Sequence, residues 1–156
     1  MCAFYRDAAG DLLADGLSLA DIATAHGSPL YVYSGNGIRT AYSDFAAAVA
    51  PVNGKVHFAV KANSALGVIA LLARHGAGAD IVSGGELERA LAAGIDPAHI
   101  VFSGVGKAKE EIARALSVGV GQINAESPAE IDMISHVAAA AGVAARCVWR
   151  AVVLRV

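Results

Sequence analysis

The middle of the chain repeats at a spacing of 21 residues, and this repeat constrains the fold more than any other feature. Equivalent places in four strand-like segments are occupied by Val60, Ile81, Phe102 and Ile123. A helix-like stretch follows each segment and stops near a glycine, namely Gly76, Gly94, Gly119 or Gly142. Alternating strands and helices at this spacing predict βαβ units with a parallel sheet and right-handed crossovers.

The expected elements have the following bounds. Strands are predicted over 56–62, 78–84, 99–106, 120–127 and 145–156. Helices are predicted between them, over 66–76, 85–94, 109–119 and 128–142. The first third of the chain differs, and predicts a short helix over 18–26, an extended stretch over 29–34 and a helix from about 36 to 50.

Two α/β architectures fit this pattern: an open doubly wound sheet, and part of a (β/α)₈ barrel. A complete barrel needs roughly 200 residues or more, so this chain can form only about half of one. In both architectures ligands bind at the carboxyl ends of the parallel strands. The side chains at the strand ends are therefore the candidates for a functional site.

The composition argues against nucleic-acid-binding, membrane-spanning and disulfide- or zinc-dependent proteins. The 156 residues are 56% hydrophobic and carry a net charge of −2, so a basic surface for nucleic acid or anionic lipid is not expected. There is no uninterrupted apolar run of about 18 residues that would span a membrane. Cys2 and Cys147 form no disulfide or zinc motif, and a cytoplasmic protein with a small-molecule substrate and no metal is expected.

The stretch "VHFAVKANSALG" ends an apolar strand on Lys61. Buried lysines are rare, so either this amine extends into solvent or it is needed at the strand end. Asp80 interrupts the next apolar strand, and because buried carboxylates are normally paired, an amine is its expected partner. Glu86 stands in the first turn of a predicted helix, where a carboxylate also favours the helix dipole.

A strand-end lysine is suited to covalent chemistry. A partly desolvated amine can attack an aldehyde and hold it as a Schiff base, and pyridoxal phosphate is the commonest such aldehyde. A nucleoside triphosphate site is excluded because "SGVGKAKEE" lacks the P-loop glycine spacing and has Ala108 after Lys107. No G-x-G-x-x-G follows a strand, so a dinucleotide site is not supported either.

Several segments in register resemble the N-terminal part of the diaminopimelate decarboxylase family. They are "GSPLYVYSGNGIRTAYSDF", "FAVKANS", "GADIVSGGELERALAAG", "IVFSGVGKAKEEIARAL" and "INAESPAEI", and together they cover roughly residues 15 to 145. The resemblance implies an alanine-racemase-like (β/α)₈ barrel, pyridoxal 5'-phosphate as cofactor, a homodimer, and decarboxylation of meso-2,6-diaminopimelate to L-lysine and CO₂. It implies a lead-in segment over 1–30 and a partial cofactor-binding barrel over 31–156, without the family's C-terminal β-domain.

The resemblance also assigns residues. Lys61 matches the lysine that forms the internal aldimine, Asp80 and Glu86 match acidic positions near the cofactor, and Arg155 matches a strand-end arginine near it. The family's ring-stacking histidine, phosphate loop and substrate-binding residues follow the point where this sequence stops. "RCVWRAVVLRV" reads unusually for the family's fifth strand. We therefore expect a truncated or frameshifted product that is poorly stable and inactive alone.

Three alternatives stay open at this point. Ornithine, arginine or carboxynorspermidine decarboxylases share this half of the barrel. Racemases also have "VKAN", although they typically continue to a Tyr-Gly pair where this chain has Ser64, Ala65 and Leu66. A non-catalytic fragment that only binds the cofactor is the third alternative.

Overall fold

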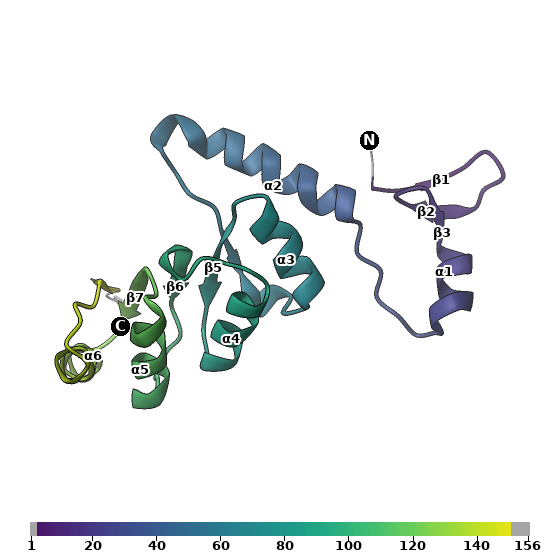
Figure 1. Ribbon diagram of the computed structural model, residues 1–156. Helices are drawn as coiled ribbons and strands as arrows, with labels where there is room; N and C mark the ends of the chain where they lie inside the picture. Colours follow the sequence, from purple (N-terminus) through teal and green to yellow (C-terminus); the bar gives the residue numbers. More distant parts are fainter. Residues whose placement is uncertain (1–2, 151–156) are drawn as a thin grey trace, which may run out of the picture. The chain divides into compact units, whose positions relative to one another are not determined.

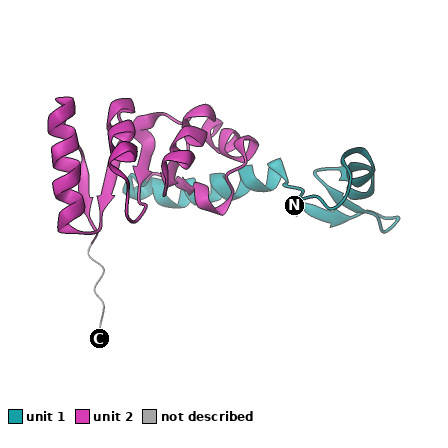
Figure 2. Ribbon diagram, turned by 90° about the horizontal axis from the view of Figure 1, so that it is seen from below, with its two compact units in different colours: residues 1–54 teal, residues 55–156 magenta. Residues whose placement is uncertain are grey.

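The chain forms two compact units, residues 1–54 and residues 55–156 (Figures 1 and 2). The structure is a computed structural model that describes residues 3–150. Each unit is described by itself below, and the second contains the repeat.

The first unit begins with a small antiparallel sheet that the sequence analysis did not predict. Its strands are β1 (Phe4–Arg6), β2 (Leu12–Ala14) and β3 (Leu17–Ser18), paired in that order. Asp15 and Gly16 connect β2 to β3 with φ values of 52° and 85°. Positive φ at both central residues is the geometry for which Asp-Gly is favoured in tight hairpins, so this dipeptide was the available signal.

Two helices complete the first unit at the predicted places. They are α1 (Leu19–His26) and α2 (Gly35–Val49), followed by a short 3₁₀ turn, η1 (Ala50–Val52). Serines cap both helices, because the Ser18 hydroxyl accepts from the Asp21 N–H and the Ser34 hydroxyl from the Gly37 N–H. The stretch predicted as extended, 29–34, belongs to no strand.

The second unit holds the strands and helices in the predicted order, but its strands have only three or four residues and are shorter than predicted, and the end of the predicted strand 145–156 lies outside the described residues. Its strands are β4 (His57–Ala59), β5 (Gly78–Ile81), β6 (Ile100–Phe102), β7 (Gln122–Ala125) and β8 (Cys147–Trp149). Its helices are α3 (Leu66–Arg74), α4 (Gly84–Ala92), α5 (Lys109–Val118) and α6 (Pro128–Ala141). Two 3₁₀ turns, η2 (Val60–Ala62) and η3 (Pro97–His99), precede α3 and β6.

The order of the strands decides between the two architectures. All five strands are parallel and pair in chain order, β4-β5-β6-β7-β8, without the reversal that defines a doubly wound sheet. Figure 1 shows the helices alternating with the strands along this unit. The α/β class and the partial (β/α)₈ barrel are confirmed, and the doubly wound alternative is wrong.

The 21-residue repeat appears in the structure as a layer of buried side chains. Ile81 pairs in register with Phe102, and Phe102 with Ile123. All three are at most 1% exposed and belong to one core with residues of α3, α4, α5 and α6. The helices therefore cover one face of the sheet. Gly119 and Gly142 end α5 and α6 in the left-handed conformation that favours glycine, as predicted.

Phe102 is fully buried at the centre of this core, and its truncation tests the packing. We expect Phe102→Ala to lower the free energy of unfolding by about 3–5 kcal/mol, through lost burial and the cavity it leaves. Urea unfolding measures the change. Phe45→Ala, at a ring that is 59% exposed on α2, is the control and is expected to change little. Equal losses in both variants would contradict the assigned core.

Candidate functional site

A cavity of about 310 Å³ opens at the carboxyl ends of the parallel strands. It is lined by Asp80 of β5 and by residues that follow β4, β5, β6 and β8, namely Lys61, Val82, Ser103, Gly104, Val105 and Arg150. The ligand-binding end of a (β/α)₈ barrel is this end, because the loops that follow the strands meet there. Two of the four predicted site residues, Lys61 and Asp80, thus lie at one cavity.

Lys61 lies in η2, directly after β4, and its side chain is exposed. Its amine forms no hydrogen bond or ion pair with any other residue in the described part of the chain. An amine that borders a cavity without a partner is available to a ligand. The strand-end position that the sequence predicted for this lysine is therefore the position it occupies.

Asp80 lies in β5 and is half-buried beside the same cavity. The amine partner expected for it is absent among the described residues, and a hydroxyl takes its place. The Ser103 hydroxyl donates to the Asp80 carboxylate and itself accepts from the Asn124 amide, with a nitrogen-to-oxygen distance of 3.0 Å. The carboxylate is thus hydrogen-bonded to a hydroxyl and forms no ion pair with a described residue, although it lines the same cavity as Lys61.

The sequence predicts Glu86 near the cofactor, but in the structure its hydrogen bonds hold the start of α4. Its carboxylate accepts from the Val82 N–H at 2.8 Å, while the Ser83 hydroxyl accepts from the Glu86 N–H at 3.3 Å. This reciprocal arrangement is a capping-box type of helix start, and it shapes the loop between β5 and α4. Glu86 does not line the cavity, and its role toward a cofactor stays a prediction.

Gly104 gives the cavity its shape. A Cβ atom at this position would lie 2.2 Å from the Val82 carbonyl oxygen, so any side chain would force the backbone apart. The loops after β5 and β6 can approach this closely only because residue 104 is glycine. Gly104 is therefore required at this position for a specific steric reason.

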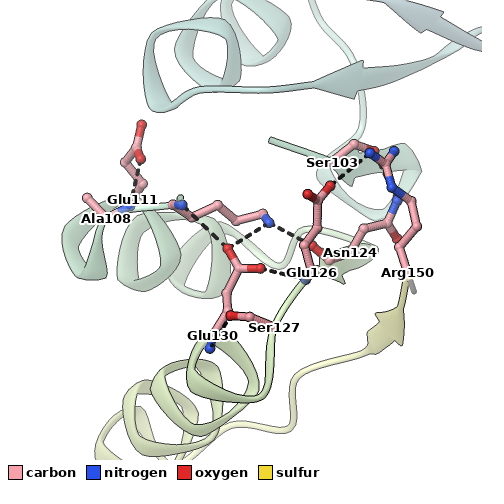
Figure 3. A network of polar contacts seen from close by, with 9 residues as sticks. Ser103, Ala108, Glu111, Asn124, Glu126, Ser127, Glu130 and Arg150 are labelled. Carbon is pink, nitrogen blue, oxygen red and sulfur yellow. Dashed lines mark hydrogen bonds and ion pairs between the residues drawn. The ribbon is translucent and has the colours of Figure 1, made fainter. Parts of the chain in front are cut away.

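Arg150 is the site residue that the sequence analysis missed. The predicted arginine, Arg155, lies outside the described residues. Strand β8 ends at Trp149, and the Arg150 N–H continues the sheet by donating to the Ala125 carbonyl at 2.8 Å. Its guanidinium lies 2.9 Å from a Glu126 carboxylate oxygen (Figure 3). Like the other parallel strands, which have only three or four residues, β8 is shorter than the sequence predicts, and its end therefore brings Arg150 rather than a later residue to the cavity.

A second lysine, Lys107, is buried under the site and fully paired. Its ammonium donates to the Asn124 carbonyl at 2.6 Å and to the Glu130 carboxylate at 3.1 Å, and it lies 5.6 Å from the centre of the Phe102 ring. The second Glu130 oxygen accepts from the Glu126 N–H at 2.8 Å (Figure 3). Burial alone would raise the pKa of Glu130, but the Glu126 N–H and the Lys107 ammonium hold it below its usual value.

A third glutamate, Glu111, connects two loops. Its two carboxylate oxygens accept from the Ala108 N–H at 2.9 Å and from the Gly84 N–H at 2.6 Å. These two backbone donors lower the pKa of Glu111, against a smaller opposing effect of burial. Glu86, Glu111 and Glu130 thus each bind loop backbone from the first turn of α4, α5 and α6, and keep the cavity rim in place.

Residues 3–150 show neither a metal centre nor a membrane-spanning helix. No three His, Cys, Asp or Glu side chains are grouped so that they could hold a metal ion. None of the helices described is both long and apolar enough to cross a membrane.

A lysine at the strand ends of a (β/α) barrel, with no partner for its amine in the described part of the chain, is suited to a domain that holds an aldehyde cofactor. Residues 36–156 match the family model described as "Pyridoxal-dependent decarboxylase, pyridoxal binding domain", and the chain belongs to this family. The cofactor that this membership implies is pyridoxal 5'-phosphate. The resemblance found in the sequence is therefore confirmed at the level of the family.

The relatives of this chain are longer proteins. It is 55% identical over 141 residues to diaminopimelate decarboxylase from Pseudomonas aeruginosa, covering 90% of this chain and 34% of the relative. It is 48% identical over 136 residues to the Vibrio cholerae enzyme of that name, covering 87% and 33%. The structure of diaminopimelate decarboxylase from M. jannaschii in complex with L-lysine matches with a TM-score of 0.91 at 32% identity, covering 95% and 35%. The chain thus spans about a third of the length of these relatives.

The residues present fit pyridoxal 5'-phosphate. The Lys61 amine has no partner within residues 3–150, which leaves it available to the aldehyde, and Arg150 brings a cation to the same cavity for an anionic group. Gly104 and the short loops leave open space beside the amine instead of filling it. The donor set and the free volume therefore agree with the family assignment.

The buried ion pair under the site is expected to be costly to break. Lys107→Met leaves the Glu130 carboxylate buried without its cation, and we expect a loss of about 3–5 kcal/mol in the free energy of unfolding. Glu88→Gln is the control, because Glu88 pairs with Arg114 in solvent at 2.7 Å, and it is expected to change stability little. Urea unfolding of both variants makes the comparison. A Lys107→Met variant as stable as Glu88→Gln would contradict the structural role of the pair.

Proposed function

We propose that this chain forms the lysine-bearing part of a pyridoxal-phosphate-dependent decarboxylase that converts meso-2,6-diaminopimelate to L-lysine and CO₂. The observation that carries the proposal is the Lys61 amine, which has no partner among the residues described and lies at the same cavity as the Asp80 carboxylate and the Arg150 guanidinium. The reaction breaks the bond between a Cα atom and its carboxylate, releases CO₂ and places a proton on that Cα. When bound, the cofactor supplies an electron sink for such bond cleavage.

Each residue at the cavity has a role that its chemistry supports. The Lys61 amine would hold the cofactor through its aldehyde carbon. The Asp80 carboxylate would stabilise positive charge on nitrogen atoms nearby, and Glu86 is proposed as a second acidic residue of the cofactor site. Arg150 would attract anionic groups of cofactor or substrate, and Arg155 stays the predicted strand-end arginine near the cofactor.

The choice of diaminopimelate as substrate is supported by the relatives. The curated relatives compared above are diaminopimelate decarboxylases, and one solved structure of such an enzyme holds L-lysine. Ornithine and arginine remain the competing substrates. The homodimer, the cytoplasmic location and a cofactor-binding region over 31–156 are also part of this proposal.

The cofactor assignment is tested on the 156-residue chain. Borohydride added after pyridoxal 5'-phosphate is expected to fix the cofactor on Lys61, and peptide mass spectrometry identifies the modified residue. Lys61→Ala should lose this modification. Lys55→Ala is the control, because Lys55 lies outside the cavity. Equal labelling of the wild-type chain and the Lys61→Ala variant would remove Lys61 from the site.

The reaction itself is tested with a chimera. Residues 1–150 replace the matching part of the Pseudomonas aeruginosa relative, which supplies the remaining two thirds of a full-length enzyme. We expect release of CO₂ and L-lysine from meso-diaminopimelate, and loss of turnover by at least about a thousandfold on Lys61→Ala, because the covalent step then lacks its nucleophile. A chimera that folds, binds the cofactor and acts on L-ornithine or L-arginine in preference to diaminopimelate would overturn the proposed substrate.

A further inference from the structure

We infer that Ser103 is a positioning residue that holds the Asp80 carboxylate at the cofactor cavity, and that Asn124 and Gln122 set the direction of its hydroxyl. This inference deepens the proposed function and rests on it, because Asp80 matters as the charged neighbour of Lys61. It is based on a row of polar side chains that hydrogen-bond to one another and lie outside the buried core. The row consists of Gln122, Asn124, Ser103 and Asp80.

The sheet places the row on one face. Asp80 pairs in register with Val101, and Val101 with Gln122, so Asp80 and Gln122 lie at one level of three neighbouring strands. Ser103 and Asn124 come two residues after Val101 and Gln122, and therefore point to the same face. This face is opposite to the one on which Ile81, Phe102 and Ile123 meet the helices, as the strand alternation requires.

The hydrogen bonds of the row run in one direction. The Gln122 side-chain amide donates to the Asn124 side-chain oxygen at 2.7 Å, which turns the Asn124 NH₂ group toward Ser103. That NH₂ group donates to the Ser103 hydroxyl oxygen at 3.0 Å. Because this oxygen is already accepting, the hydroxyl proton is directed to Asp80. An ionised carboxylate only accepts hydrogen bonds, so the row is complete when Asp80 carries its negative charge.

The Ser103 hydroxyl has no other structural task. Ser103 does not cap α5, because this helix begins only at Lys109 and Ala108 occupies its cap position. The Ser103 N–H serves the sheet by donating to the Ile81 carbonyl at 2.8 Å, which does not involve the side chain. Both Ser103 and Asp80 line the cavity with Lys61. The hydroxyl is therefore placed to control how Asp80 faces the ligand.

The orientation of the Asp80 carboxylate matters because of the other charged groups that line the cavity. Lys61 and Arg150 are the cations that line it, and Arg150 is held by Glu126. Asp80 remains as the carboxylate that lines the cavity and is paired with neither cation among the described residues. Its orientation therefore determines how negative charge is presented to a positively charged nitrogen at Lys61.

The first measurement uses the chain without cofactor, with the Asp80 carboxyl carbon observed by NMR at neutral pH. We expect a clear chemical-shift change in Ser103→Ala and in Asn124→Asp, because the first removes the donor and the second offers the hydroxyl a competing acceptor. Ser117→Ala is the matched control, since the Ser117 hydroxyl donates to the Arg114 carbonyl on the exposed side of α5. An Asp80 signal unchanged in both test variants would overturn the inference, whatever the cofactor does.

The second measurement uses pyridoxal 5'-phosphate as probe, with borohydride trapping at Lys61 as the readout. We expect about tenfold more cofactor to be needed for half-maximal trapping in Ser103→Ala and Asn124→Asp, and less than a twofold change in Ser103→Thr, which retains the hydroxyl, and in Ser117→Ala. Trapping in Ser103→Ala at wild-type cofactor concentrations would overturn the inference and leave the proposed function standing. A wild-type chain that is not labelled at Lys61 would instead contradict the proposed function, while the NMR comparison still decides the role of Ser103.

Discussion

The parallel register of β5, β6 and β7 is the constraint on which the site depends. It brings Ile81, Phe102 and Ile123 together under the helices, where their burial stabilises the unit. Because side chains alternate along a strand, the same register sends Asp80, Ser103 and Asn124 to the opposite face. The polar row is thus a consequence of the apolar core, and a shift of one residue in the pairing would bury the row and expose the core.

Two lysines lie at the same end of the sheet, and their surroundings determine that one stabilises the fold while the other is available to a ligand. Lys107 has a buried side chain that is fully paired with Glu130 and the Asn124 carbonyl. Lys61 is exposed at the cavity and has no partner among the described residues. A buried charge needs such partners to offset its desolvation, whereas a nucleophilic amine must be left available. The first lysine stabilises the loops that frame the second.

The sequence predicted the second unit well and the first unit less well. Helices α3 to α6 lie within about two residues of their expected bounds, because each combines an apolar face with a glycine at its end. The sheet of β1, β2 and β3 was missed, because its strands have only two or three residues and show no clear alternation. Arg150 was missed because apolar residues continue on both sides of it, so the sequence does not mark where β8 ends, and strand pairing with β7 supplies that information.

By itself, the sequence determined the βαβ repeat, the position of Lys61 after an apolar strand and the family, because periodicity and motifs are local properties of the chain. Only the tertiary structure decided which polar groups meet. Asp80 binds Ser103 rather than an amine, and Lys107 binds Glu130, although 23 residues separate the partners in each pair. Such partners are chosen by the order of strands, their register and the close packing of their loops. These are non-local properties, and they become visible only when the sheet is assembled.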